Sequence, residues 1–329
     1  MTGRFRRILY GAPDELVPLA PDETSIVVER EMPEAVHRAL SALVAGRPDV
    51  GLSLLADEDL EMLRWYPGLR RLNGTSLRLR SLDGLRHVAG TLEWLSVGDA
   101  LRRLSLRPIE QAHGLRRLGV SGTWKDLDAI GALTGLERLA IGSVDLEILR
   151  PLASLRRFES GLGTVRSLEL LSDIGRLELV ELYRLRGEHD LTPLGRVETL
   201  RYLILESTRS VTTLPSFARC PELRWIALDE MRGITDLRPI ADAPNLEVLM
   251  LIGMRQLDAE SIRPLVGHPT LRAGIWGLSS DRKNIAAQDL LPLPPEPWNY
   301  PADRRREPLN APAPWDRPDW DGVVHPLRS

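Results

Sequence analysis

A short apolar phrase recurs along most of the chain. It reads Leu-x-x-Leu-x-Leu or a close variant, and successive copies begin 19 to 25 residues apart. The copies begin at Leu69, Leu92, Leu115, Leu136, Leu155, Leu177, Leu200, Leu223, Leu246 and Leu271. A unit of this length cannot enclose a hydrophobic core by itself, so we expect the copies to stack into one elongated solenoid.

Each copy divides into a strand and a return segment. The apolar residues of one copy are Leu223, Ile226, Leu228, Ile234, Leu237 and Ile240. The first three alternate as in a short strand, and the last three are spaced as in the segment that leads back to the next strand. Because side chains alternate along a strand, we expect the leucines to point inward and the third, fifth and seventh residues of each phrase to line the opposite, concave face.

The chain before the copies has a different pattern. Residues 24–29 are β-branched and predict a strand, residues 32–45 place apolar side chains at helical spacing, and residues 50–54 alternate as a second strand. We therefore expect residues 1–48 to form an N-terminal α/β cap over the open end of the core. The solenoid itself is predicted over residues 49–286.

The composition changes sharply in the C-terminal tail, residues 287–329. This segment holds ten prolines and the aromatic residues Trp298, Tyr300, Trp315 and Trp320, with no regular period. The prolines favour a polyproline-like conformation. The aromatic residues leave two alternatives open, a tail that packs back along the solenoid and a free peptide that is offered to a partner.

Two segments of one copy carry a family resemblance. Ile234-Thr235-Asp236-Leu237-Arg238-Pro239-Ile240 and Asn245-Leu246-Glu247-Val248-Leu249-Met250-Leu251 resemble leucine-rich repeats of the 22-residue class in the phosphatase-regulator and internalin families. The resemblance covers roughly residues 50–280. It implies an α/β solenoid, a leucine-rich repeat horseshoe with a parallel concave β-sheet, and it is unspecific for function.

One departure from that family concerns the turn after each strand. The family usually places an asparagine there, and the side chain of this asparagine forms hydrogen bonds with the backbone of the turn. The corresponding positions here are Ala100, Thr123, Val144, Gly163, Leu185, Thr208, Met231 and Met254. Since an unpaired buried backbone group costs about 1 to 3 kcal/mol, we expect irregular turns, short helical returns or ordered waters to satisfy these amides.

Charge and cysteine content narrow the classes of function. The net charge is −3, which provides no overall positive field for nucleic acid. Cys220 is the only cysteine, so no disulfide can form within the chain, and no apolar run is long enough for a membrane span. We expect a cytoplasmic protein that binds neither nucleic acid nor membranes; the sequence does not indicate its oligomeric state.

The sequence contains no recognisable catalytic motif. Nucleophile elbows, phosphate loops and paired Cys-x-x-Cys or His-x-x-x-His metal ligands are absent, and the six histidines are scattered. We therefore expect no enzyme activity, no cofactor and no metal. The remaining alternative is a cation site or an enzyme site on three carboxylates of the concave face, Glu181, Glu206 and Asp229.

The predicted concave face has two parts. The first is a column of Trp94, Arg117, Arg138 and Arg157 beside small residues, where the arginines could bind carboxylates, although such arginines are also expected as repeat filler on a solvated strand face. The second part places the apolar residues Tyr183, Tyr202, Trp225, Val248 and Met250 among Glu181, Glu206 and Asp229. Aromatic anchors rimmed by charged residues are typical of protein interfaces.

These observations predict a non-catalytic protein-protein interaction module that binds a protein partner on its concave face. Two alternatives remain. The tail could be the binding element of a structural or autoinhibited scaffold, or Trp298 or Trp315 could fill the concave groove of the same chain.

Overall fold

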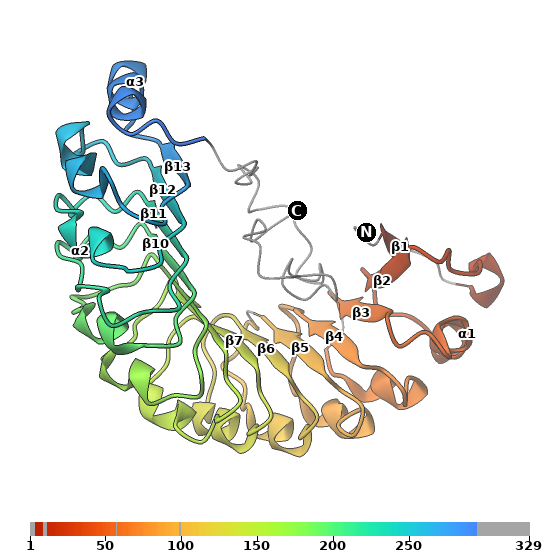
Figure 1. The fold of residues 1–329 in the computed structure, drawn as a ribbon. Helices are drawn as coiled ribbons and strands as arrows, with labels where there is room; N and C mark the ends of the chain where they lie inside the picture. Colours follow the sequence, from red (N-terminus) through yellow and green to blue (C-terminus); the bar gives the residue numbers. More distant parts are fainter. Residues whose placement is uncertain (1–3, 9–11, 57, 99, 295–329) are drawn as a thin grey trace. The chain divides into compact units, whose positions relative to one another are not determined.

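The computed structural model describes residues 4–8, 12–56, 58–98 and 100–294. The described residues divide into two compact units, residues up to 139 and residues 140–294. In each unit, parallel strands follow one another in sequence order and form one layer, and short helices form a second layer (Figure 1).

The N-terminal unit contains the following elements: β1 (Arg4–Ile8), η1 (Pro13–Glu15), β2 (Glu23–Val28), α1 (Glu34–Val44), β3 (Gly51–Leu54), η2 (Glu61–Trp65), β4 (Arg71–Gly74), η3 (Asp83–His87), β5 (Trp94–Val97), η4 (Arg107–Gln111), β6 (Arg117–Val120) and η5 (Leu127–Ala132). The boundary between the two units falls inside β7 (Arg138–Ile141).

The C-terminal unit continues with η6 (Leu146–Leu149), β8 (Arg157–Gly161), η7 (Glu169–Ser172), β9 (Leu179–Tyr183), η8 (Thr192–Arg196), β10 (Tyr202–Glu206), β11 (Trp225–Asp229), α2 (Arg238–Ala241), β12 (Val248–Ile252), η9 (Glu260–Leu265), β13 (Ala273–Trp276) and α3 (Asp281–Leu290). The elements labelled η are 3-10 helices.

The repeated phrase positions every strand from β4 to β13. In each of these copies the strand begins at the third residue of the phrase, from Arg71 in the first copy to Ala273 in the last. The prediction of a leucine-rich repeat solenoid is confirmed. The predicted strand at residues 24–29 and the predicted helix at 32–45 correspond to β2 and α1, whereas β1 was not anticipated.

The leucines that follow the first strand residue form the core. In the C-terminal unit, Val180, Leu203, Ile226 and Leu249 lie opposite one another on β9 to β12 and are fully buried. Leu72, Leu95 and Leu118 form the same kind of row on β4 to β6. Each repeat therefore buries its apolar side chains against its neighbours rather than within itself.

A serine or aspartate begins most of the return helices. Its side-chain oxygen accepts a hydrogen bond from the backbone N–H two residues later. Such bonds run from Glu61 to Asp59 (2.9 Å), from Asp83 to Ser81 (2.9 Å), from Glu147 to Asp145 (3.2 Å), from Thr192 to Asp190 (2.8 Å) and from Arg238 to Asp236 (2.9 Å). These bonds satisfy backbone donors at the start of each return, which a 3-10 turn cannot satisfy internally.

A left-handed residue follows each strand from β8 to β11. These residues are Leu162 (φ 58°), Arg184 (φ 48°), Ser207 (φ 51°) and Glu230 (φ 49°). Each donates its N–H to the carbonyl of the last residue of the next strand, over 3.1, 2.8, 2.8 and 2.8 Å respectively. This repeated turn and the 3-10 returns take the place of the missing asparagines, as the sequence led us to expect.

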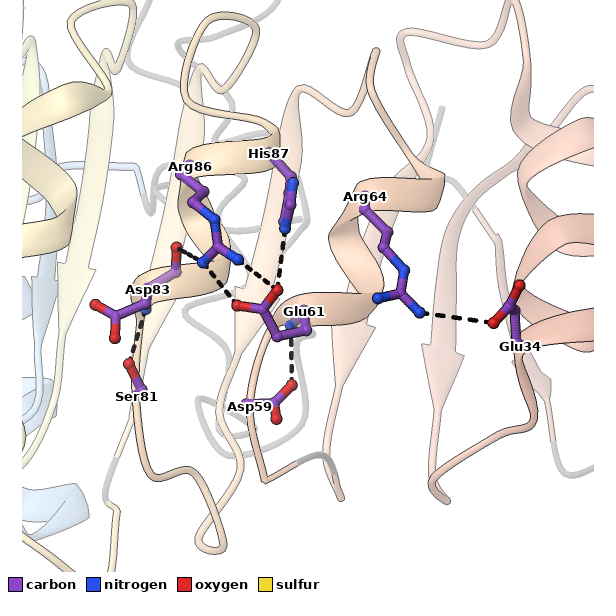
Figure 2. Close-up of polar contacts among 8 residues, drawn as sticks. All are labelled: Glu34, Asp59, Glu61, Arg64, Ser81, Asp83, Arg86 and His87. Atoms are coloured by element: carbon purple, nitrogen blue, oxygen red, sulfur yellow. Dashed lines mark hydrogen bonds and ion pairs between the residues drawn. The ribbon is translucent and has the colours of Figure 1, made fainter.

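The N-terminal helix packs on the first return. His37 of α1 is 3% exposed, and its Nδ1 lies 3.0 Å from the hydroxyl of Tyr66. Figure 2 shows the ion pair between Glu34 of α1 and Arg64 of η2, at 3.6 Å. The guanidinium groups of Arg38 and Arg64 also lie over the ring of Trp65, at 4.2 and 5.1 Å from its centroid. These contacts join α1 to the first repeat.

Glu61 joins the first two returns. Its carboxylate accepts hydrogen bonds of 2.7 and 2.6 Å from Arg86 of η3 and lies 3.1 Å from Nε2 of His87 (Figure 2). The bond from Arg86 is the main reason that the pKa of Glu61 is lowered, followed by the contact with His87. The carboxylate is partly exposed, so we regard the pair as a link between repeats with a small effect on stability.

The last repeat is closed by α3 and the segment after it. Lys283 of α3 donates hydrogen bonds to the carbonyls of Arg255 (2.6 Å) and Leu257 (2.8 Å). The indole N–H of Trp276 donates to the carbonyl of Leu291 over 3.2 Å. Since α3 continues to Leu290, the first residues of the predicted tail are helical. Residues 295–329, including the four aromatic residues of that tail, lie outside the described residues.

Candidate protein-interaction surface

Three rows of side chains lie on the face of the C-terminal sheet opposite the core. We call this the outer face; it corresponds to the predicted concave face. The first row is Arg157, Leu179, Tyr202, Trp225 and Val248. The second row is Glu159, Glu181, Ile204, Ala227 and Met250. The third row is Gly161, Tyr183, Glu206, Asp229 and Ile252.

The register brings most of the predicted site residues together. Tyr202, Trp225 and Val248 are direct neighbours in the first row, and Glu206 pairs with Asp229 in the third. Neighbouring parallel strands lie about 4.8 Å apart, so these side chains form a continuous surface. Met250 borders this surface in the second row.

The other predicted residues belong to the N-terminal part of the repeats. Trp94 and Arg117 are register partners at the start of β5 and β6, and Arg138 begins β7. All three side chains are half-buried, as is Arg157 at the start of β8. The aromatic and acidic residues thus belong to the C-terminal unit, whereas Trp94 and Arg117 belong to the N-terminal unit.

The predicted residues of the N-terminal repeats and those of the C-terminal unit differ in how deeply they are buried. Along β6 and β7, half-buried residues alternate with buried ones, as expected for a sheet with one solvated face. From β9 to β12, the first four residues of every strand are buried. Trp225 is 1% exposed and Met250 is 0% exposed, although both lie on the outer face. We had expected exposed aromatic anchors here; Tyr202 and Trp225 are buried instead, whereas Tyr183 is half-buried.

Burial also changes the acidity of Tyr202. It raises the pKa of the phenol to about 12, while the positive charges of Arg201 and Arg157 act in the opposite direction. Because the ordinary value is about 10, the folded chain retains this proton at a pH where the unfolded chain has lost it.

We therefore expect one tyrosine of the folded chain to ionise near pH 12. Because the unfolded chain releases this proton first, the free energy of unfolding should fall as the pH rises from 10 toward 12. Absorbance at 295 nm against pH measures the phenolate. The late step should be absent from the Tyr202→Phe variant. A late step that survives in this variant would assign it to another tyrosine.

The acidic residues do not form a metal site in the part of the chain that the structure describes. No group of three or more His, Cys, Asp or Glu side chains there is arranged to hold a metal ion. Cys220 is buried, and burial raises the pKa of its thiol to about 11. Its Sγ donates a weak hydrogen bond to the carbonyl of Leu194 at 3.7 Å, which is the environment of a structural thiol.

Sequence reasoning missed a ladder of alternating charge beside the strands. The second residue of the phrase is an arginine or a glutamate, and opposite charges meet in adjacent repeats. The pairs are Arg70 with Glu93 (3.0 Å), Arg116 with Glu137, Arg156 with Glu178, and Glu247 with Arg224 (3.5 Å) and Arg272 (3.0 Å). The sign alternation was visible in the sequence. We had considered only the arginines of the third position, one residue later in the phrase, and had weighed those as repeat filler.

Solved structures with a similar fold are leucine-rich repeat proteins. An internalin (InlF) from Listeria monocytogenes is 19% identical, with a TM-score of 0.57, over 84% of this chain and 87% of that chain. A leucine-rich repeat protein from Leptospira interrogans is 14% identical, with a TM-score of 0.51, over 86% and 93% of the two chains. No protein-family model and no curated protein matches the sequence.

The strand register, the buried leucine rows and these two structures together assign the leucine-rich repeat fold. Identities this low establish the fold alone. Among the described residues, no helix combines the length and the apolar character needed to cross a membrane.

Proposed function

We propose that the protein is a non-catalytic protein-protein interaction module that binds a protein partner on the outer face of its C-terminal sheet. The observation that carries this proposal is the first row, in which Tyr202, Trp225 and Val248 adjoin on three paired strands. Large aromatic side chains on a rigid sheet lose little conformational entropy on binding, so they are effective anchors.

The acidic residues give this surface its selectivity. Glu206 and Asp229 lie side by side in the third row, and both are half-buried. Charges at the rim of an interface accelerate association with a partner of opposite charge and disfavour partners of like charge. We therefore expect the partner to present basic residues toward the third row. Arg117, Arg138 and Arg157 are proposed as a second, electrostatic contact.

The absence of catalysis and the compartment belong to the same proposal. The carboxylates of the outer face are not grouped as metal ligands within the described residues, which supports a binding role rather than chemistry. The single buried cysteine suits a reducing compartment, so we place the protein in the cytoplasm.

Reversing the charge at the third row tests this function. We expect the Glu206→Arg/Asp229→Arg double variant to lose at least tenfold in partner capture from an extract of the native organism, quantified by mass spectrometry. The reason is that basic groups of the partner would meet like charges.

A matched control makes the same change of charge elsewhere in the unit. Glu188 and Glu222 are exposed and lie outside the three rows, so the Glu188→Arg/Glu222→Arg variant should capture as the wild type does. Equal capture by the wild type and the third-row variant would refute the footprint. Thermal unfolding of all three proteins checks that the fold is retained.

A further inference from the structure

Three leucines of the N-terminal unit lie at equivalent positions in successive loops and are exposed to solvent. Leu55, Leu77 and Leu101 are 41%, 57% and 80% exposed, and we call them the leucine row. Each lies four residues before the residue whose side chain caps the following return. The capping residues are Asp59, Ser81 and Ser105. The three leucines therefore mark one repeated position of the fold.

The loops that carry the leucine row are neighbours. The N–H of Leu101 donates a hydrogen bond of 2.9 Å to the carbonyl of Leu77. The N–H of Arg80 donates one of 2.6 Å to the carbonyl of Glu58, and these two residues each directly precede a capping residue. Equivalent residues of successive loops thus lie side by side, at about the 4.8 Å spacing of paired strands. The leucine row is therefore a continuous apolar strip.

The fold does not require this strip. In the same loops Leu79 and Leu82 are buried and supply the apolar contacts of the core. A single exposed leucine needs no explanation. Three of them at one position of adjacent repeats form a patch, and contiguous apolar surface of this kind marks interaction sites. We therefore interpret the leucine row as a binding surface.

Positive charge borders the leucine row on its return side. The exposed arginines that follow Leu77 and Leu101 in the chain are Arg78, Arg80, Arg102 and Arg103. Glu58 alone pairs with both arginines of the first loop, at 3.3 and 3.0 Å. Arg102 and Arg103 have no carboxylate partner among the residues that the structure describes; Asp99 lies outside them. Guanidinium groups in this position favour a ligand with carboxylates along one side.

The spacing of the leucine row selects a helical ligand. One leucine recurs about every 4.8 Å, whereas an α-helix rises about 5.4 Å per turn and a strand returns to the same face about every 6.7 Å. Across the three loops a helix would drift from the row by about 1 Å and an extended segment by about 4 Å. A helix that lies across the loops can therefore place one apolar residue on each leucine.

The surface beside the row is hollowed, which favours a protein ligand over a lipid surface. A hollow of about 240 Å³ lies between the second and third loops, lined by residues 80–83 of one repeat and 104, 105, 107 and 108 of the next. Arg80, Ser81 and Ser105 offer polar groups in its wall. A side chain of a docked helix can enter this space, whereas a bilayer surface would lie across it.

We propose that the leucine row binds an amphipathic α-helix of a partner protein. The apolar face of this helix lies on Leu55, Leu77 and Leu101, and its acidic flank faces the arginines that follow them. The surface belongs to the N-terminal unit and shares no residue with the outer face of the C-terminal sheet, so the proposal does not rest on the proposed function.

A synthetic helical peptide tests the proposal on the full-length chain. The peptide has about 18 residues, or five turns, with leucine at every third or fourth position and glutamate on the flank. Fluorescence anisotropy should show saturable binding, about tenfold weaker or more in the Leu77→Ser/Leu101→Ser variant because most of the apolar contact is lost. The control is Leu162→Ser, since Leu162 is 59% exposed and belongs to the other unit. It should bind as the wild type does.

A second peptide with lysine in place of every glutamate should bind about tenfold more weakly or worse, because it brings like charges to the arginines. No binding of the glutamate peptide, equal affinity for both peptides, or equal affinity of the wild type and the Leu77→Ser/Leu101→Ser variant would overturn the proposal. Thermal unfolding of the three proteins verifies that the fold is retained.

Two other occupants of the leucine row have their own readouts. Sedimentation with vesicles of about 30% phosphatidylserine in phosphatidylcholine, lost in the Leu77→Ser/Leu101→Ser variant, would show a lipid contact instead and overturn the proposal. A dimer of the wild type that the same variant abolishes would make a second copy the occupant and would also overturn it. No extract is used, so a failure here is distinct from a failure of the capture experiment.

Discussion

Replacing Leu203 with alanine is expected to lower the free energy of unfolding by about 2 to 5 kcal/mol. Leu203 is fully buried and lies between Val180 and Ile226 in the core row of the C-terminal unit. The substitution removes apolar area that both neighbouring repeats share, and a cavity remains because parallel strands cannot approach one another to fill it. Urea unfolding followed by circular dichroism measures the change.

The matched control removes the same atoms from an exposed leucine of the same unit. Leu162 is 59% exposed and follows β8 in a left-handed turn, a conformation that alanine and leucine tolerate equally. We expect Leu162→Ala to change the unfolding free energy by about 0.5 kcal/mol or less. Equal losses from the two variants would mean that the leucine rows are not the core.

Acid is expected to destabilise the N-terminal unit through His37. Burial is the main cause that lowers the pKa of this imidazole from 6.5 to about 4, and the positive charge of Arg64 is the second. Between these two values the unfolded chain binds a proton that the folded chain does not. Stability is therefore complete above pH 6.5 and falls as the pH decreases toward 4, by about 3 kcal/mol in total.

Unfolding free energies measured from pH 7 to pH 4 test this expectation. The His37→Gln variant should lose most of the slope between pH 6.5 and 4, because the titrating group is gone. The His113→Gln variant makes the same substitution at an exposed site and is the control for the change of side chain. An unchanged slope in His37→Gln would assign the acid sensitivity to other groups.

The sequence predicted the strands of the repeats closely because one physical signal repeats ten times. A strand begins two residues after Leu69, Leu200 and Leu271 alike, since the position of the leucine in the core determines where the strand begins. The N-terminal helix was also predictable from its apolar spacing. By contrast, β1 was missed because residues 4–8 lack a clear alternation of apolar and polar residues.

The candidate surface was predictable in position but not in exposure. The alternation of side chains placed Tyr202 and Trp225 on the face opposite the core, and the parallel register made them neighbours. Nothing in the local pattern indicated that these side chains would be buried, because the alternation of side chains tells the face on which a residue lies and not its exposure. The serine and aspartate caps of the returns were visible in the sequence, at Ser81 and Asp236 for example, and take over part of the asparagine's role.

The side on which Trp225 lies is the central claim, and a photocrosslinker at that position tests it most directly. p-Benzoylphenylalanine is close to tryptophan in size, and we expect residue 225 to crosslink to its neighbours on the outer face, such as Tyr202 and Val248. Crosslinks to interior side chains of the neighbouring return, such as Leu214 and Phe217, would show that residue 225 faces the core and would contradict the account.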